Sequence, residues 1–186
     1  MNPVKNFCRE VCAGRRTSVY CRVVTTKPPA RLLEFLDQQQ VWYQLRHHPT
    51  VFTAQELAAV IGVKGRSQAK VVLVTDGDSL WMTVLPADHR LDFAKLESGL
   101  GRPVQLARED QFRDRFPDCA VGAAPPFGNL YDLPTILDQR LAAEPFLVFA
   151  AGTHTDGMRV EMADYQRLAQ PQVADIACKP TPMTAP

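Results

Sequence analysis

Long apolar runs are absent from this chain of 186 residues. No stretch approaches the ~20 consecutive apolar residues that a helix needs to cross a bilayer, so we expect no membrane span. The glycine-rich fingerprints of dinucleotide- and phosphate-binding loops are absent too, as are the serine-hydrolase motif G-x-S-x-G and the zinc-protease motif H-E-x-x-H. The sequence therefore gives no support to these common classes of protein.

Cysteine is scarce, and its spacing does not suit zinc. Three of the five cysteines, Cys8, Cys12 and Cys21, form a C-x3-C-x8-C pattern without a companion histidine. Structural zinc sites usually need two closely spaced pairs of ligands. An odd number of cysteines without a secretory signal favours reduced thiols. We therefore expect a cytoplasmic protein with no metal site and no cofactor.

Excess positive charge is confined to the N-terminal part. Residues 1–29 carry six Lys or Arg residues and one acidic residue, Glu10, so the rest of the chain has 15 basic and 19 acidic residues. The main body therefore lacks the positive field of a general nucleic-acid binder, and any contact with RNA must be local. We divide the chain into a basic, loosely ordered extension (1–28), one domain (29–178) and a flexible tail (179–186). The extension also has the Arg-rich composition of an organelle transit peptide, but no clear amphipathic helix.

Short strands and short helices are interleaved along the domain. Apolar alternation, Val-rich runs and turn residues predict strands at 41–46, 69–75, 80–85, 104–107, 133–137, 146–150 and 158–162. Helical periodicity and capping residues predict helices at 30–40, 53–62, 92–98, 109–116 and 163–168. The links are too short for a regular series of crossover helices. The predicted fold class is therefore α+β, a single compact domain with a curved, mainly antiparallel mixed sheet flanked by short helices.

Lys70 is the first candidate functional residue, because it opens the apolar run of residues 71–74. A lysine at the start of a buried strand can hold its ammonium at the rim of the core. From there the ammonium can reach a phosphate or a substrate carbonyl as a point charge. The alternative is a strand-end lysine whose ammonium only reaches solvent.

A loop stiffened by two prolines is the second candidate. It consists of Gly122, Ala123, Ala124, Pro125, Pro126, Phe127 and Gly128. Exposed backbone N–H groups in a rigid segment suit contact with a ligand, and Phe127 can supply a flat wall against a base or an apolar group. Taken alone, the segment is also compatible with a purely structural loop.

The segment 151–155, which contains His154, directly follows the strand predicted at 146–150. A glycine at a strand end allows close approach to the backbone, and the imidazole can orient water or accept a hydrogen bond. The alternative is a surface histidine in a turn. His47 and His48 are adjacent, so on an extended chain they point to opposite faces and do not easily form a metal pair. We expect these two to be structural.

Together, the three candidate segments resemble those of the YbaK-type aminoacyl-tRNA deacylases, which are similar to the editing insertion of bacterial prolyl-tRNA synthetases. The resemblance covers about residues 29–177. It rests on Ala69-Lys70-Val71-Val72-Leu73-Val74, on Gly122–Gly128 with Leu133-Pro134 and Asp138 after it, on Ala151-Gly152-Thr153-His154 and on Met162–Leu168. Each motif is weak alone, but their common order and spacing make the resemblance specific.

The resemblance implies hydrolysis of the ester that joins an amino acid to the terminal adenosine of tRNA. The predicted function is trans-editing of tRNA mischarged with a small amino acid such as alanine, serine or threonine. By resemblance, the catalytic residues are Lys70, Gly152 and His154. The implied substrate-binding residues are Gly122, Ala123, Ala124, Pro125, Pro126, Phe127, Gly128 and Thr153. Relatives often have two glycines in place of Ala151-Gly152, and some have lysine in place of His154, which bears on substrate choice.

Two other functions stay open from the sequence. One is hydrolysis of another small acyl ester, and the other is a non-catalytic module that binds tRNA or a synthetase. The expected partner is the acceptor end of aminoacyl-tRNA, with an aminoacyl-tRNA synthetase as a further candidate. Lys64, Arg66 and Lys70 lie close in sequence and form a candidate phosphate-facing cluster. The amino acid removed, the tRNA and the oligomeric state stay open.

Overall fold

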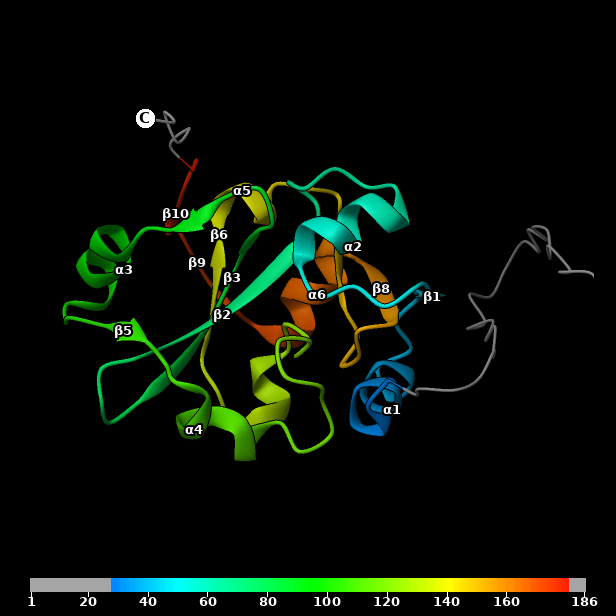
Figure 1. Ribbon diagram of the computed structural model, residues 1–186, viewed down its shortest axis with the longest axis horizontal. Coiled ribbons are helices and arrows are strands. Elements are labelled where there is room, and N and C mark those ends of the chain that lie inside the picture. Colours follow the sequence, from blue (N-terminus) through cyan, green and yellow to red (C-terminus); the bar gives the residue numbers. More distant parts are fainter. Residues whose placement is uncertain (1–27, 181–186) are drawn as a thin grey trace, which may run out of the picture.

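Residues 28–180 are described by the computed structural model of the protein (Figure 1). The predicted extension and tail therefore fall almost entirely outside the described residues. The helices are α1 (Ala30–Gln38), α2 (Ala54–Ile61), α3 (Phe93–Leu100), α4 (Glu109–Phe112), α5 (Gln139–Ala142) and α6 (Met162–Ala169), with 3-10 turns η1 (Arg113–Arg115) and η2 (Gly128–Tyr131). The strands are β1 (Tyr43–His47), β2 (Ala69–Thr75), β3 (Leu80–Pro86), β4 (Arg90–Leu91), β5 (Gln105–Leu106), β6 (Thr135–Asp138), β7 (Phe146–Ala150), β8 (Asp156–Glu161), β9 (Gln172–Ala174) and β10 (Ala177–Cys178).

The largest sheet has five strands in the order β5-β2-β3-β6-β9. Its centre is the antiparallel hairpin β2–β3, in which Ala69 pairs with Pro86 and Thr75 with Leu80. The Asp76 carboxylate accepts hydrogen bonds from two backbone N–H groups of the connecting turn, which closes the hairpin. The pairs β3–β6 and β6–β9 are parallel.

A second, antiparallel sheet has the order β1-β8-β7. It joins the first sheet at a single parallel bridge between Gln68 and Val148, and the Val148 N–H donates to the Ser67 carbonyl at 3.0 Å. The start of β2 is therefore fixed against β7. The pocket described in the next section lies at this junction.

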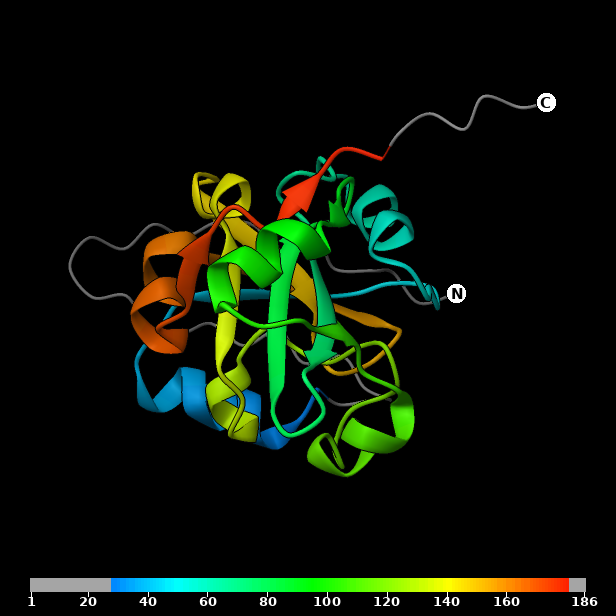
Figure 2. The ribbon, with the colours of Figure 1, turned by 90° about the vertical axis from the view of Figure 1, so that its left-hand side faces the viewer.

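Apolar side chains form two cores. In the smaller one, Leu96 of α3 packs with Val74 and Ile136 of the five-stranded sheet, and Figure 2 shows α3 crossing in front of these strands. The larger core lies between the two sheets and includes residues of α1, α6 and the 122–133 segment. Its largest fully buried side chains include Leu32, Leu36, Phe127, Phe149 and Tyr165. Burial of such side chains from both sheets stabilises one domain.

The predicted α+β class, with a mixed sheet and short helices, is confirmed. The strands divide between two multi-stranded sheets and a short β4–β10 ribbon rather than lying in one curved sheet. The helix predicted at 109–116 is α-helical only in α4 and continues as η1, because Phe112 has a φ of −130°. The elements β4, β9, β10 and α5 were not predicted, since elements of two to four residues carry too little periodicity.

Candidate functional site

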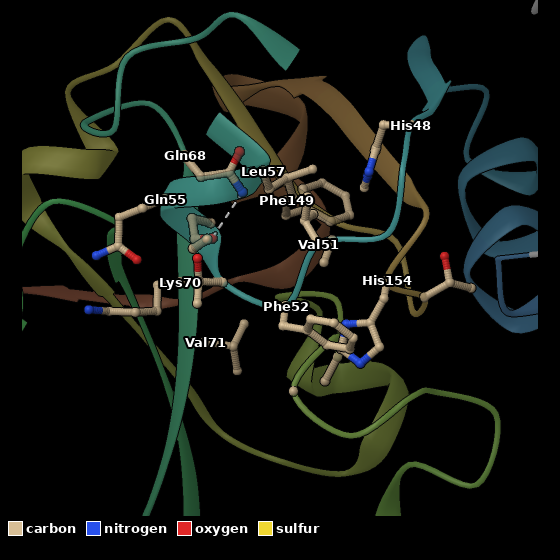
Figure 3. A pocket seen from close by; sticks show the side chains of 17 residues that line it. His48, Val51, Phe52, Gln55, Leu57, Gln68, Lys70, Val71, Phe149 and His154 are labelled. Atoms are coloured by element: carbon tan, nitrogen blue, oxygen red, sulfur yellow. Dashed lines mark hydrogen bonds between the residues drawn. The ribbon is translucent and has the colours of Figure 1, made fainter. Parts of the chain in front are cut away.

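A pocket of about 270 Å³ lies where the start of β2 meets the end of β7. Three further segments close it: the chain leading into α2, the loop around Gly122 and the turn that contains His154 (Figure 3). Most of the lining is apolar, and the polar side chains lie among the apolar ones. The lining residues are His48, Val51, Phe52, Thr53, Ala54, Gln55, Leu57, Gln68, Ala69, Lys70, Val71, Gly122, Ala124, Phe149, Ala150, Thr153 and His154.

Lys70 lies on β2, opposite Leu85 of β3. Its ammonium donates a hydrogen bond to the His89 carbonyl at 2.7 Å. Figure 3 shows Lys70 and His154 on opposite sides of the pocket, with the lysine side chain extending away from the histidine. The predicted residue therefore lines the pocket, and its charge is held at the rim.

The environment of Lys70 shifts the pKa of its ammonium. Partial burial lowers the pKa of its ammonium below the ordinary lysine value, because the charged form is poorly solvated there. The positive charge of Arg90 lowers this pKa further, whereas the negative charge of Asp88 acts in the opposite direction. A lysine with such a shift in a pocket is typical of functional sites.

The proline-stiffened loop contributes only part of its length to the pocket. Gly122 and Ala124 line it, whereas Ala123, Pro125 and Pro126 are buried. Gly122 has a φ of +81°, which favours glycine. The loop is hydrogen-bonded to the segment that contains His154, since the Gly152 N–H donates to the Ala123 carbonyl at 2.9 Å.

Phe127 and Gly128, expected in the substrate wall, lie in the core instead. Phe127 is 0% exposed and makes edge-to-face contacts with Phe149 and Tyr165. A Cβ on Gly128 would lie 2.5 Å from the Leu133 carbonyl oxygen. Neither residue lines the pocket, although Phe127 packs against the lining residue Phe149.

The turn that carries His154 is held by the buried carboxylate of Asp156. Thr153 and Thr155 both donate their hydroxyls to this carboxylate, and His47 Nδ1 lies 3.2 Å from it. The His154 carbonyl also accepts the Val51 N–H at 2.9 Å. A backbone hydrogen bond therefore connects this turn to the segment that precedes α2.

Two aromatic rings meet at the mouth of the pocket. The His154 imidazole lies against the ring of Phe52, with 4.8 Å between ring centres. Phe52 is 71% exposed, so most of its ring faces solvent. A large exposed aromatic side chain beside a pocket offers a surface for an apolar or flat group.

Gly152, predicted as catalytic, does not line the pocket. Its φ is +84°, and a Cβ at this position would lie 2.2 Å from Cδ of Pro29. Glycine is therefore required for the close approach of α1 to this turn. The contribution of Gly152 to the site is the conformation of the turn that presents Thr153 and His154.

His48 is a pocket residue that sequence reasoning treated as structural. Its side chain is 6% exposed, whereas the neighbouring His47 contacts Asp156. Gln68, which is fully buried, also lines the pocket and was not singled out. The alternation of side chains along an extended chain could have indicated that one of the two histidines faces inward.

Two of the three residues in the candidate phosphate-facing cluster are engaged in contacts within the protein. Arg66 forms an ion pair with Glu144 at 3.2 Å, and Lys70 is engaged with His89. Lys64 is exposed. In the part of the chain that the structure describes, no helix is long and apolar enough to cross a membrane, and no cluster of three or more His, Cys, Asp or Glu side chains is arranged for a metal ion.

The pocket is small, lies at the junction of the two sheets and is lined by both apolar and ionisable groups. Such a pocket is typical of a small α+β domain that acts on a compact ligand group. The chain belongs to the aminoacyl-tRNA editing domain family, whose sequence profile matches residues 48–168, more than half of the chain. The predicted family is therefore confirmed, and so is the predicted class of activity, hydrolysis of the ester in mischarged tRNA.

Individual relatives agree with this assignment. The chain is 26% identical over 151 residues to the multifunctional Ser/Thr-tRNA deacylase ProXp-y of Escherichia coli (strain K12), covering 78% of this chain and 90% of that protein. A crystal structure of a hypothetical protein matches with a TM-score of 0.72 and 21% identity over 80% of this chain and 99% of that one. Another, of a protein provisionally described as a trans-editing enzyme for prolyl-tRNA synthetase, matches with a TM-score of 0.69 and 24% identity over 81% of this chain and 96% of that one. At these identities the two structures show the shared fold.

Proposed function

We propose that this protein acts in trans on tRNA mischarged with a small amino acid, and that hydrolysis takes place in the pocket between β2, α2 and the His154 turn. The observation that carries the proposal is that one cavity is lined by Lys70, Gly122 and His154, which are far apart in sequence. A volume of about 270 Å³ lies below the range of ~300–1,000 Å³ that is common for ligand pockets. Such a cavity suits a small aminoacyl group better than a large one.

The chemistry proposed for this pocket needs no covalent nucleophile. An aminoacyl ester is already activated, so orientation of a water molecule or of the ribose hydroxyl and stabilisation of the developing oxyanion are sufficient. His154 at the mouth can orient the attacking oxygen or accept its hydrogen bond. Gly122 and Ala124, which also line the pocket, would limit the size of the amino acid.

Lys70 is the proposed cationic contact for the terminal nucleotide or the aminoacyl carbonyl. Its present hydrogen bond to His89 is a single contact at the rim, worth ~1.5–3 kcal/mol net because the donor is charged. The flexible stem of a lysine allows the ammonium to exchange this carbonyl for a substrate oxygen. Exclusion of bulky side chains must supply most of the selectivity, because a missing methylene gives only ~1–3 kcal/mol by binding.

The test is deacylation of a full set of mischarged tRNAs by the purified protein. We expect turnover of tRNAs that carry alanine, serine or threonine and little turnover of those that carry large amino acids. Free aminoacyl esters without tRNA should be poor substrates. Equal turnover of simple esters would favour a general small-acyl esterase, and no turnover of any charged tRNA would refute the proposed function.

A substitution separates the proposed role of Lys70 from a structural one. Lys70→Ala should lower kcat/KM by about 100-fold or more, the size typical for loss of one preorganised electrostatic contact. Lys95→Ala is the matched control, because Lys95 lies on α3 and pairs with Asp175, outside the pocket lining. Unchanged turnover by Lys70→Ala would contradict the role assigned to this lysine.

A further inference from the structure

The His48 imidazole has a fixed orientation in the pocket. Its Nδ1 lies 2.8 Å from the carbonyl oxygen of Pro49, an atom that can only accept a hydrogen bond. Nδ1 must therefore carry the proton, and in the neutral ring Nε2 has only a lone pair to offer. The geometry thus makes Nε2 a hydrogen-bond acceptor.

This acceptor is buried and lacks a partner. Nε2 of His48 makes no hydrogen bond to any group in residues 28–180, although the side chain is only 6% exposed. A buried polar atom without a partner carries a desolvation cost, so its presence in a binding pocket points to a group supplied by the ligand. Figure 3 shows the ring reaching into the pocket toward Phe149.

We propose that His48 Nε2 accepts a hydrogen bond from the α-amino group of the aminoacyl ester, an inference that rests on the proposed function. The carbonyl and ester oxygens of the substrate only accept hydrogen bonds and cannot pair with this nitrogen. The α-amino group is the donor that all aminoacyl esters of primary amino acids share. It carries two or three N–H groups, so one can pair with His48 while the others reach water or backbone carbonyls.

Depth in the pocket distinguishes the α-amino group from the ribose hydroxyls. Phe52 at the mouth is 71% exposed, whereas His48 and Phe149, which line the same pocket, are 6% and 1% exposed. A charged tRNA enters with its aminoacyl group first and its terminal adenosine last. The deep acceptor therefore meets the amino acid, and the exposed ring of Phe52 meets the nucleotide.

The proposed contact is tested by a double-mutant cycle, in which a substitution in the protein is combined with removal of a group from the substrate. His48→Phe removes the acceptor and keeps a planar ring, and propionyl-tRNA is alanyl-tRNA without the α-amino group. Their kcat/KM values are measured with both proteins, and the ratio of ratios cancels both the intrinsic reactivity of each ester and the folded fraction of each protein. We expect His48→Phe to lower kcat/KM about 10- to 100-fold for alanyl-tRNA, as for a hydrogen bond to a charged group. The loss for propionyl-tRNA should be less than about threefold.

Two further variants test whether the effect is specific to Nε2 of His48. His48→Gln offers an amide oxygen near the position of Nε2 and should restore part of the preference for the amino group. Gln68→Met is the matched control. It removes Oε1 of Gln68, the other buried acceptor in the described lining that has no partner. This substitution should change kcat/KM for both substrates by the same factor. Figure 3 shows Leu57 and Phe149 between Gln68 and His48, so the two acceptors face different parts of the pocket.

Equal losses on alanyl- and propionyl-tRNA in His48→Phe would overturn the inference. A loss confined to seryl- and threonyl-tRNA would overturn it too, since it would assign Nε2 to the side-chain hydroxyl. Both results leave the proposed function intact, because the parent protein would still be active. Absence of deacylation in the parent protein refutes the proposed function instead.

Discussion

The ammonium of Lys70 lies 2.7 Å from the carbonyl oxygen of His89, in the connection between β3 and β4. This contact holds the charge at the rim of the pocket, where the positive charge of Arg90 lowers its pKa and the negative charge of Asp88 raises it. Occupation of the pocket by an aminoacylated end would replace a backbone carbonyl with a substrate oxygen. The local charges of the β3–β4 connection therefore set how readily Lys70 serves as a cation.

The titration of Lys70 should differ from that of an ordinary lysine. Since burial and Arg90 lower its pKa, the ammonium should lose its proton at a lower pH than a lysine in an unstructured peptide. Removal of the opposing carboxylate by Asp88→Asn should lower this pKa further, and Arg90→Gln should raise it. The measurement is an NMR titration of 13Cε-labelled lysine, with Lys70→Ala to assign the signal. A Lys70 signal that titrates like a lysine in an unstructured peptide would contradict this environment.

Gly152→Ala should destabilise the domain. A methyl group at this position would meet the Pro29 ring at 2.2 Å, and the φ of +84° is strained for alanine. Strain and overpacking together predict a loss of ~2–5 kcal/mol in the free energy of unfolding, measured by urea denaturation. Gly99→Ala in α3 is the control, because nothing lies within 4 Å of its Cβ and alanine favours the helix. The expectation fails if both variants unfold at the same urea concentration.

Phe52→Ala should reduce activity without reducing stability. The ring is largely exposed, so its loss should change the free energy of unfolding by less than ~0.5 kcal/mol. Loss of its contact with His154 and of the apolar mouth should lower kcat/KM on charged tRNA by about tenfold. Val60→Ala, an exposed apolar residue of α2 outside the pocket lining, should leave both quantities unchanged. Full activity in Phe52→Ala would show that the mouth does not contact substrate.

Asp156→Ala should loosen the turn that presents His154. The substitution removes the buried acceptor of two threonine hydroxyls, which predicts a loss of ~1–3 kcal/mol in the free energy of unfolding. Because His154 would lose its fixed position, kcat should fall more than KM rises. Asp164→Ala is the control, since Asp164 forms a surface pair with Arg167 that is worth ~0–1 kcal/mol. Equal effects of the two substitutions on kcat would exclude a positioning role for Asp156.

Local sequence signals predicted most of the regular elements. The Val-rich run of β2 and the turn at Asp76 predicted the central hairpin, and the Thr53–Glu56 capping box that starts α2 is present. The strands β4 and β10 are two residues long and pair with each other across 86 positions of sequence. Such pairing depends on partners far along the chain and leaves no local pattern.

The candidate site was predicted in its segments and only partly in its side chains. Lys70, Thr153 and His154 line the pocket as expected, whereas Phe127 is in the core and His48 is in the pocket. A sequence pattern shows that a residue is apolar or lies in a stiff loop. It does not show whether the ring points into a cavity or into the interior.

The order and spacing of short motifs determined the family and the class of reaction, because each motif is a local stretch that can be recognised without knowledge of the packing. The tertiary structure decided which side chains line the pocket. That choice depends on how β2 is joined to β7 at Gln68 and on the packing of α1 against Gly152. Contacts between residues that are distant along the chain are set by the packing of the whole core, and no local stretch of sequence encodes them.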